Sequence, residues 1–408
     1  MPETAARSTS LNLDGLAEAT IRRGLEGHDV EEQLSAFAEQ VRAAGVPIKR
    51  VSMGMTTLHP QFGALTYVWR PGAGRAENAP QQRDILQSEA FKLSPIKYLL
   101  ESGQERFRQR LDIEDPLPFP VLEEIRDEGM TDYAACLIRF GSDSVGDGQL
   151  EGVFFSCATD VAEGLDAGHI NQVLALLPHL ALAVKARLTY DVAKTVAQTY
   201  LGEDAGKRVL TGEIVRGSTR SIDAVIWFCD LRGFTGLAGQ VDQAELIELL
   251  DAYLETMARP VKRHQGQILK FMGDGFLATF QLTDADRSEV SRRALSAALE
   301  LRAEYARFNQ AREAAGEPVL GFGLSLHVGE VLYGNIGADE RLDFTVVGPA
   351  VNVAARVQDL CRPLGKDVLV SSAFYDAVGR SDVVLEPLGV HTLRGVDEAR
   401  ELFTVPAD

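Results

Sequence analysis

The stretch Phe228-Cys229-Asp230-Leu231-Arg232-Gly233-Phe234-Thr235 decides the fold of the C-terminal half of the chain. The apolar run from Ala224 to Phe228 leads into it and is typical of a buried strand. The strand is expected to end at Asp230, where Gly233 permits a tight turn before a helical pattern that begins at Asp242. This arrangement places a carboxylate at a strand end, beside backbone that can approach a ligand closely.

A second carboxylate lies in Lys270-Phe271-Met272-Gly273-Asp274-Gly275. Residues 268–272 and 276–280 are predicted strands, and Gly-Asp-Gly between them is a hairpin signal. Taken alone, each Asp has a simpler interpretation as a turn residue that hydrogen-bonds its own backbone. The compact loop after Asp230 leads toward a helix, where backbone N–H groups can meet phosphate, and this favours a binding site.

A third segment lies downstream, Thr345-Val346-Val347-Gly348-Pro349-Ala350-Val351-Asn352-Val353-Ala354-Ala355-Arg356. The three segments, in this order and spacing, resemble the catalytic domain of class III nucleotide cyclases. The resemblance covers roughly Ser218 to Val405, and it implies a ferredoxin-like core that dimerises head to tail. The mixture of predicted strands and helices itself indicates an α+β fold, an antiparallel sheet with helices on one face. The expected elements are strands over 222–229, 267–280 (a hairpin), 320–335, 367–370, 383–392 and 400–405, and helices over 243–264, 285–308 and 349–361.

The resemblance assigns roles to individual residues of this sequence. It implies that two Mg²⁺ or Mn²⁺ ions per active site are held by Asp230, Asp274 and the backbone carbonyl of Leu231. The substrate phosphates would be bound by the loop Gly233, Phe234 and Thr235, and more loosely by Arg394. Asn352 would position the ribose, and Arg356, one helical turn later, would stabilise charge at the α-phosphoryl group.

Lys270 and Thr345 stand at the positions that read the base in this family. A lysine can only donate hydrogen bonds, so Lys270 suits adenine N1 and would confront the N1–H of guanine. Thr345 can accept from adenine N6 but can also donate, so it discriminates weakly. Many family members have Asp there, and the threonine resembles a subclass that often responds to bicarbonate. The preferred interpretation is an adenylate cyclase acting on ATP as a homodimer, because in this family the two halves of each centre come from opposite protomers. A guanylate cyclase and a catalytically silent nucleotide-binding module are the alternatives.

Composition narrows the remaining possibilities. The chain has 408 residues and a formal net charge of −18, which disfavours binding to nucleic acid or to an anionic membrane. No apolar run approaches the length of a membrane span, and the polar start lacks the h-region of a signal peptide. The four cysteines are scattered without metal-ligand spacing, so buried thiols in a cytoplasmic protein are expected.

The N-terminal half is predicted to be a separate regulatory domain over 13–168, after a disordered start over 1–12. Its expected order of helix, hairpin, variable middle, hairpin and closing helix resembles a GAF-like sensor domain, with PAS-like as the rival. Within the variable middle, a polar loop is expected over 75–87 and a helix over 94–111. A small molecule or bicarbonate would be the effector. The candidate pocket residues are Met53, Met55, His59, Trp69, Tyr98 and Cys157.

A helical connector is predicted over 169–217, before a catalytic domain over 218–408. Apolar residues follow heptad a and d positions for little more than two heptads: Ile170, Val173, Leu177, Leu180 and Val184. Two interpretations stay open. The helix closes its own domain by packing on it, or it dimerises and transmits a signal.

Overall fold

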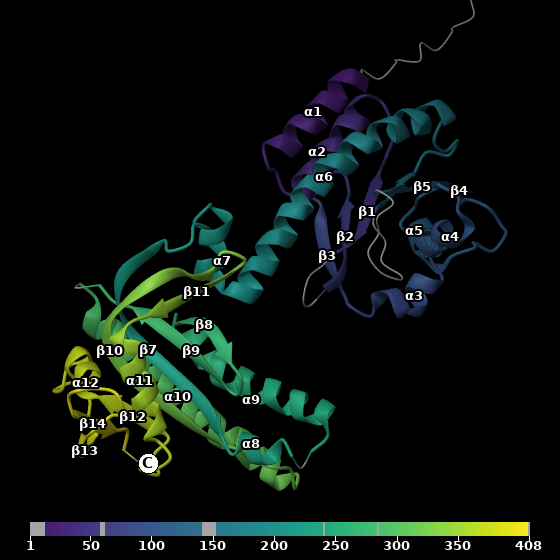
Figure 1. Ribbon diagram of the computed structural model, residues 1–408. Coiled ribbons are helices and arrows are strands. Elements are labelled where there is room, and N and C mark those ends of the chain that lie inside the picture. Colours follow the sequence, from purple (N-terminus) through teal and green to yellow (C-terminus); the bar gives the residue numbers. More distant parts are fainter. Residues whose placement is uncertain (1–12, 58–61, 141–151, 240, 284, 407–408) are drawn as a thin grey trace, which may run out of the picture. The chain divides into compact units, whose positions relative to one another are not determined.

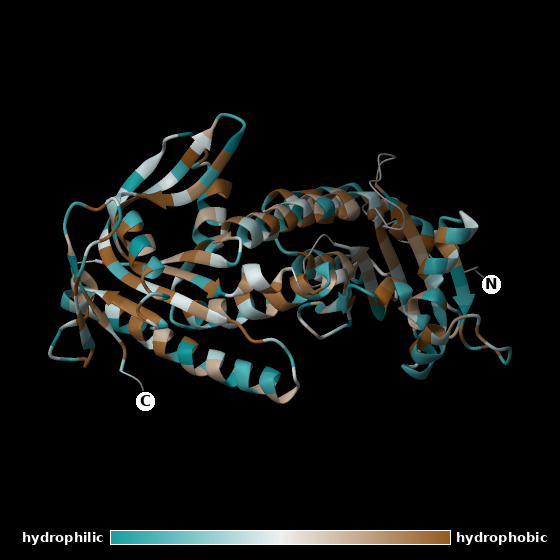
Figure 2. Cartoon of the chain, turned by 60° about the horizontal axis from the view of Figure 1, so that its bottom comes forward, coloured by the Kyte–Doolittle hydropathy of each residue, from teal (hydrophilic) through white to brown (hydrophobic). Residues whose placement is uncertain are grey.

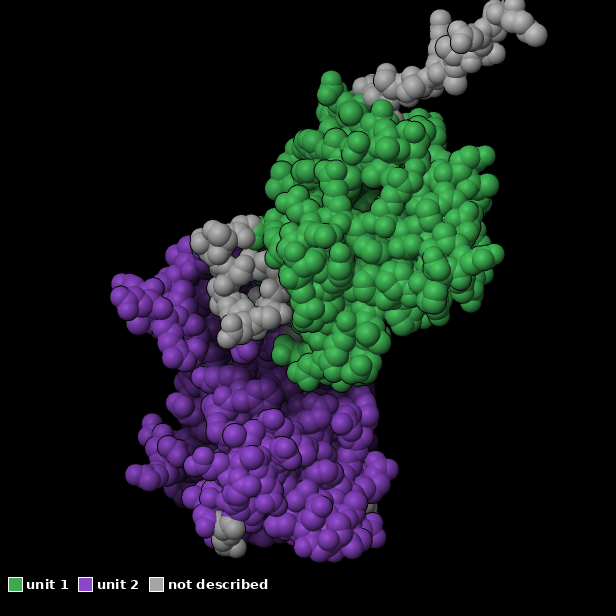
Figure 3. Space-filling view, turned by 90° about the vertical axis from the view of Figure 1, so that its right-hand side faces the viewer, with its two compact units in different colours: residues 1–196 green, residues 197–408 purple. Residues whose placement is uncertain are grey.

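The protein consists of two compact units, residues 1–196 and residues 197–408 (Figure 3). A computed structural model describes residues 13–57, 62–140, 152–239, 241–283 and 285–406. The predicted disordered start over 1–12 and the candidate pocket residue His59 therefore lie outside the described residues. Figure 1 labels the helices and strands of both units. Figure 2 shows hydrophobic residues gathered along the strands, whereas the helices carry both hydrophobic and hydrophilic residues.

Unit 1 is built on a six-stranded sheet in the order β3-β2-β1-β6-β5-β4, in which all neighbours are antiparallel. Helices α2 and α6 pack on one face of this sheet, and α4 and α5 pack on the other. Strands β5 and β6 are consequently buried along nearly their whole length. The strands are β1 (Arg50–Thr56), β2 (Phe62–Trp69), β3 (Glu77–Gln82), β4 (Arg106–Arg110), β5 (Asp132–Arg139) and β6 (Gly152–Thr159). The helices are α1 (Leu13–Leu25), α2 (Val30–Ala43), η1 (Ile85–Gln87), α3 (Glu89–Lys92), α4 (Pro95–Ser102), α5 (Pro120–Asp127) and α6 (Ala167–Leu201).

Two predictions for the middle of unit 1 were wrong. The helix expected over 94–111 ends at Ser102, because Gly103 takes the left-handed conformation (φ 70°) that commonly terminates helices. The chain then continues as edge strand β4. The expected polar loop contains β3, an edge strand that tolerates its polar sequence and Pro80 because most of it is exposed.

The predicted pocket residues of unit 1 are mostly core. Met53, Met55 and Trp69 are buried in the cluster beneath α2 and α6. Tyr98 packs in an aromatic group with Phe107 and Phe119, on the opposite face.

The apolar face that the heptad positions form on helix α6 packs inside unit 1. Val173, Leu177, Leu180 and Val184 are buried in the unit's own core, which supports the packing interpretation for this part of the helix. By length and composition alone, α6 is also apolar enough to cross a membrane, which corrects the expectation that no such run exists. This is weak support for a membrane helix, since a core helix passes the same test.

Unit 2 contains a mixed sheet in the order β13-β14-β12-β10-β7-β9-β8, with β11 paired to β10. Strands β7, β8, β9 and β10, with α9 and α10 between them, form a βαββαβ core in the ferredoxin-like order. All pairs are antiparallel except β10 with β12. The strands are β7 (Thr219–Arg232), β8 (Gln267–Met272), β9 (Gly275–Gln281), β10 (Gly321–Ala338), β11 (Arg341–Val347), β12 (Val368–Ser371), β13 (Glu386–His391) and β14 (Arg400–Thr404). The helices are α7 (Glu203–Leu210), α8 (Phe234–Leu237), α9 (Gln243–Arg263), α10 (Arg287–Ala314), α11 (Pro349–Asp359) and α12 (Ser372–Val378).

Helices cover both faces of this sheet, so the prediction of helices on one face was wrong. Alternate residues of β7 point to opposite sides. Val225, Trp227 and Cys229 join the core beneath α9, α10 and α12. Their neighbours Ala224 and Ile226 join a second cluster, which contains residues of α7 and α11. The predicted site residues of α11 therefore belong to the face opposite to α9 and α10.

Small residues let α11 lie close to the sheet. A Cβ atom on Gly329 of β10 would lie 2.6 Å from the Cβ of Ala350. One turn further along α11, the Ser325 hydroxyl donates to the Ala354 carbonyl oxygen at 2.7 Å. The distance between helix and sheet at this point is therefore fixed by backbone and by β-carbons, which cannot move aside as a long side chain can.

We expect Gly329→Ala to destabilise unit 2 by about 1–3 kcal/mol, because the added methyl group must push α11 away from β10. Chemical denaturation of the full chain measures the effect. Gly239→Ala is the matched control, since a Cβ there meets no atom within 4 Å. Equal stability of the two variants would contradict the close packing of α11.

Candidate active site

The structure brings the two carboxylates that were predicted to bind metal, Asp230 and Asp274, together near the end of β7. Asp230 pairs directly with Gly275, the first residue of β9, and the Leu231 N–H donates to the Asp274 carbonyl oxygen at 3.0 Å. Gly273 (φ 67°) and Asp274 form the two-residue turn between β8 and β9. A Cβ on Gly275 would lie 2.7 Å from the Cβ of Asp230, so the hairpin can approach β7 this closely only with glycine there.

Both carboxylates carry negative charge into a partly buried site. Burial, and then the charge of Asp274, raise the pKa of Asp230 to about 6, while Arg232 opposes this rise. The Gln358 amide of α11 donates a hydrogen bond to Asp230 Oδ1. A cation between the carboxylates would relieve the repulsion between them, which is the second cause of the raised pKa.

The donor set fits a hard divalent cation. Magnesium prefers few carboxylates and completes its shell with water and phosphate oxygens. Across the described ranges, no group of three or more His, Cys, Asp or Glu side chains could hold a metal ion. A metal held by Asp230 and Asp274 would therefore take its other ligands from backbone, such as the Leu231 carbonyl, from water and from a bound nucleotide.

The predicted phosphate loop follows directly after β7. Gly233 takes a left-handed conformation (φ 89°) and precedes α8, a single turn that starts at Phe234. The N–H groups of Phe234 and Thr235 lie in this first turn, where backbone donors lack partners within the helix. The turn at Gly233 was predicted from the sequence, whereas the short helix α8 was not, since a loop was expected there before the helix that begins near Asp242. Phosphate binding at this turn stays a prediction.

Asn352 and Arg356 lie four residues apart on α11 and are both exposed. Residues Val353, Ala354 and Val357 form the buried side of the same helix. The Arg356 guanidinium pairs with Asp359 of its own helix at 2.9 Å. Within the described residues, it makes no ion pair with Asp230 or Asp274, so the structure does not bring Arg356 onto the carboxylates of its own chain.

The two predicted base-reading residues lie on different strands. Lys270 of β8 pairs with Leu277, which pairs in turn with Phe228, and this register puts Lys270 on the sheet face that also carries Asp230. Thr345 of β11 is 5% exposed, and its hydroxyl has no hydrogen-bond partner in the part of the chain that the structure describes. A buried hydroxyl without a partner is costly and is suited to a ligand that supplies one.

Arg394 is exposed in the segment between β13 and β14. It makes no hydrogen bond or ion pair to the other predicted site residues among those described. The structure therefore gives this looser assignment no support from contacts.

Gln358 is the site residue that the sequence analysis missed. It is 7% exposed, and its amide lies close enough to β10 that a Cβ on Gly323 would be 2.8 Å from Nε2. Its bond to Asp230 fixes one carboxylate oxygen and leaves the other for a ligand. The signal was present in the sequence, since Gln358 lies four residues after Ala354 on the inward side of α11, where an apolar residue is expected.

Asp230→Asn should stabilise the metal-free chain increasingly as the pH rises from about 4 to about 7. The folded-state pKa of Asp230 is raised above its ordinary value, so its contribution to stability is present at low pH and is lost as the pH rises through about 6. The variant has no such group to ionise. The measurement is the difference in Tm between variant and wild type, in chelator, across this pH range. A difference that does not change with pH would contradict the raised pKa.

The part of the chain that matches a known family contains all the predicted site residues. Residues 218–405 match the family model for the adenylate and guanylate cyclase catalytic domain. The chain is 28% identical over 254 residues to an adenylate cyclase of Anabaena cylindrica, covering 60% of this chain and 48% of that protein. It is 30% identical over 178 residues to adenylate cyclase 1 of Rhizobium meliloti (strain 1021), covering 44% of this chain and 26% of that protein. The chain thus spans less than half the length of either curated relative.

Among solved structures, the chain is similar to the adenylyl cyclase CyaB from P. aeruginosa, with 24% identity and a TM-score of 0.43 over 47% of this chain and 97% of that one. A bacterial light-regulated adenylyl cyclase matches with 19% identity and a TM-score of 0.46, over 74% of this chain and 93% of that one. The family match confirms, for residues 218–405, the adenylate and guanylate cyclase catalytic domain that the three sequence segments predicted.

Proposed function

We propose that this protein is an adenylate cyclase, which converts ATP to 3′,5′-cyclic AMP and pyrophosphate in a homodimer. The observation that carries the proposal is the pair of carboxylates, Asp230 and Asp274, held together by the pairing of β7 with β9. In the proposed reaction the ribose 3′-hydroxyl attacks the α-phosphorus of its own triphosphate. The similarity to curated adenylate cyclases supports this class of reaction.

The side chains would divide the chemistry among them. Divalent ions, once bound, would acidify the 3′-hydroxyl and neutralise phosphate charge. Asp230 and Asp274 would hold these ions, and Gln358 keeps one Asp230 oxygen in place. Arg356 would stabilise the charge that develops at the α-phosphoryl group, since a planar guanidinium can donate two parallel hydrogen bonds. Asn352, on the same side of α11, would orient the ribose.

Adenine is the base that the donor inventory favours. Lys270 offers donors only, which suits the N1 acceptor of adenine. The unpartnered hydroxyl of Thr345 would gain an acceptor role toward N6. Because the same hydroxyl can donate to guanine O6, GTP is the second candidate substrate, and Lys270 carries most of the discrimination.

The exposed site residues and apolar residues of one chain support a homodimer. Asn352 and Arg356 face away from the sheet. Leu332 and Val347, which are directly paired across β10 and β11, are 46% and 39% exposed. Exposed apolar residues next to site residues are typical of a surface that a partner covers. In the proposed dimer, Arg356 of one chain serves the carboxylates of the other.

The N-terminal unit would regulate this activity as a GAF-like domain of a cytoplasmic protein, with a small molecule or bicarbonate as effector. Its order of helices, hairpin, variable middle, hairpin and closing helix supports this assignment. Helix α6 continues without a break to Leu201 and carries exposed Val196 and Tyr200 near its end. We place the regulatory domain at 13–168, the connector at 169–217 and the catalytic domain at 218–408.

Asp230→Ala and Asp274→Ala should each abolish cyclic AMP formation from Mg²⁺-ATP or Mn²⁺-ATP while the chain stays folded. Arg356→Ala should lower kcat by roughly 10²–10³-fold, as the loss of one transition-state donor does elsewhere.

Mixing Asp230→Ala with Arg356→Ala should restore activity. Random exchange makes half of the dimers mixed, each with one intact centre of two, so roughly a quarter of wild-type turnover is expected.

Chromatographic product analysis measures these activities, and labelled subunits show that exchange has occurred. Full turnover by either Asp variant would overturn the metal assignment. No recovery after demonstrated exchange would overturn the shared site while leaving the reaction itself intact.

Lys270→Glu should shift the preference between ATP and GTP toward GTP by about tenfold or more, because a mispaired buried polar group costs roughly 1–3 kcal/mol. Glutamate accepts from guanine N1–H, where lysine cannot. The added negative charge near Asp274 slows both reactions, so the ratio of the two kcat/KM values is the informative quantity. A ratio that the substitution leaves unmoved would show that Lys270 does not read the base.

A further inference from the structure

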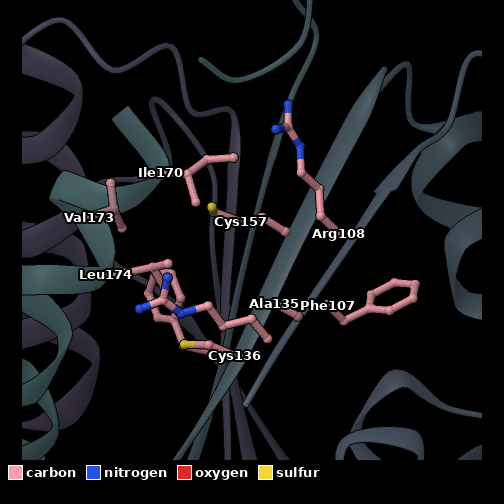
Figure 4. A pocket seen from close by; sticks show the side chains of 11 residues that line it. Phe107, Arg108, Ala135, Cys136, Cys157, Ile170, Val173 and Leu174 are labelled. Carbon is pink, nitrogen blue, oxygen red and sulfur yellow. The ribbon is translucent and has the colours of Figure 1, made fainter. Parts of the chain in front are cut away.

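Unit 1 contains a cavity of about 250 Å³ between edge strand β4, strands β5 and β6, and the first turns of α6 (Figure 4). It lies on the sheet face that α6 covers. The catalytic residues of unit 2 take no part in it. Of the pocket residues predicted from the sequence and described by the structure, Cys157 is the one that lines it.

The register of the sheet explains which side chains form the floor. Cys136 pairs with Phe155, and Ala134 pairs with Cys157, so all four project from the same face. The two cysteines and Phe155 are buried. In Figure 4 the sulfur atoms of Cys136 and Cys157 lie on the side where α6 presents Ile170, Val173 and Leu174, while Phe107 points to the other side.

The two thiols are part of an apolar wall. Burial raises the pKa of both Cys136 and Cys157 to about 12, so they are neutral near pH 7. The register sets them diagonally across β5 and β6, not opposite each other, and both are free. Neutral buried thiols behave as small hydrophobic groups, which suits a hydrocarbon ligand.

One guanidinium at the rim is available for a ligand. Arg108 of β4 is engaged, since it donates to Asp132 and to the Leu165 carbonyl oxygen, both at 2.6 Å. Arg106 pairs with Cys136 in the sheet and therefore projects toward the same cavity. The Arg106 guanidinium makes no hydrogen bond or ion pair with any residue that the structure describes. An apolar cavity with a single unpaired cation at its rim selects amphipathic anions.

We propose that this cavity binds a small apolar monocarboxylate. Its hydrocarbon part would lie against the thiols, Phe155 and the α6 side chains, and its carboxylate would accept hydrogen bonds from Arg106. The ligand is small, because the cavity falls just below the roughly 300–1,000 Å³ of drug-sized sites. It carries one negative charge, since Asp132 already compensates Arg108. This inference is independent of the cyclase proposal, and its test measures binding alone.

The test is titration calorimetry of octanoate into the full chain, with octanamide as the neutral ligand of matched length. We expect one octanoate site per chain and binding of octanamide weaker by about tenfold or more, the usual effect of losing a charged hydrogen bond. Arg106→Gln should weaken octanoate to the level of octanamide. Arg126→Gln, which removes an exposed arginine from α5 outside the cavity lining, should leave octanoate binding unchanged.

Filling the cavity locates the site. Ala134→Leu adds a side chain from the sheet and Leu174→Phe adds one from α6, and either should abolish binding of both ligands. Circular dichroism and Tm identify a variant that fails to fold, in which case the other variant decides. Absence of octanoate binding to the wild type overturns the proposal. Equal affinities for octanoate and octanamide also overturn it, in favour of a neutral ligand, and so does full octanoate binding by a folded, cavity-filled variant.

Discussion

The pairing of Asp230 with Gly275 is the constraint on which the catalytic unit depends. Because Gly275 has no side chain, the β8–β9 hairpin approaches the end of β7 closely enough to bring Asp274 beside Asp230. Burial, and then repulsion by Asp274, raise the pKa of Asp230, so folding disfavours the charged form of this carboxylate. Such an arrangement persists where a cation offsets it, and this links the local strand geometry directly to the proposed chemistry.

A second constraint positions the opposite half of the site. Gly329, Ala350 and the Ser325 hydroxyl fix the distance between α11 and the sheet. The same helix points Gln358 inward, onto Asp230, and points Asn352 and Arg356 outward. One helix therefore holds Asp230 of its own chain with its inward side and exposes Asn352 and Arg356 on its other side, which is compatible with the proposed site shared between two chains.

The sequence was most informative where local chemistry determines structure. The Gly-Asp-Gly turn, the buried strand before Asp230 and the helix after Gly348 were predicted within a few residues, because turn residues and apolar runs act locally. The helix expected through Leu111 was wrong, since a glycine ended it and an arginine-rich edge strand followed. The placement of α11 on the second sheet face depends on contacts between distant segments, such as Gly329 with Ala350, which no local pattern encodes.

Site residues divide in the same way. Asp274 could be found because it sits in a recognisable turn, and Asp230 because it lies near the end of an apolar strand, just before the turn at Gly233. Gln358, in contrast, bonds to a residue 128 positions away in the sequence and looks like an ordinary helical residue. The heptad pattern of α6 shows that a local pattern can also fit two different structures. Its spacing fits a coiled coil and a core helix equally well, and only the burial of Val173, Leu177, Leu180 and Val184 in their own unit distinguishes the two. The periodicity shows that one face of the helix will be buried. Whether its own unit or another chain buries that face depends on the rest of the fold.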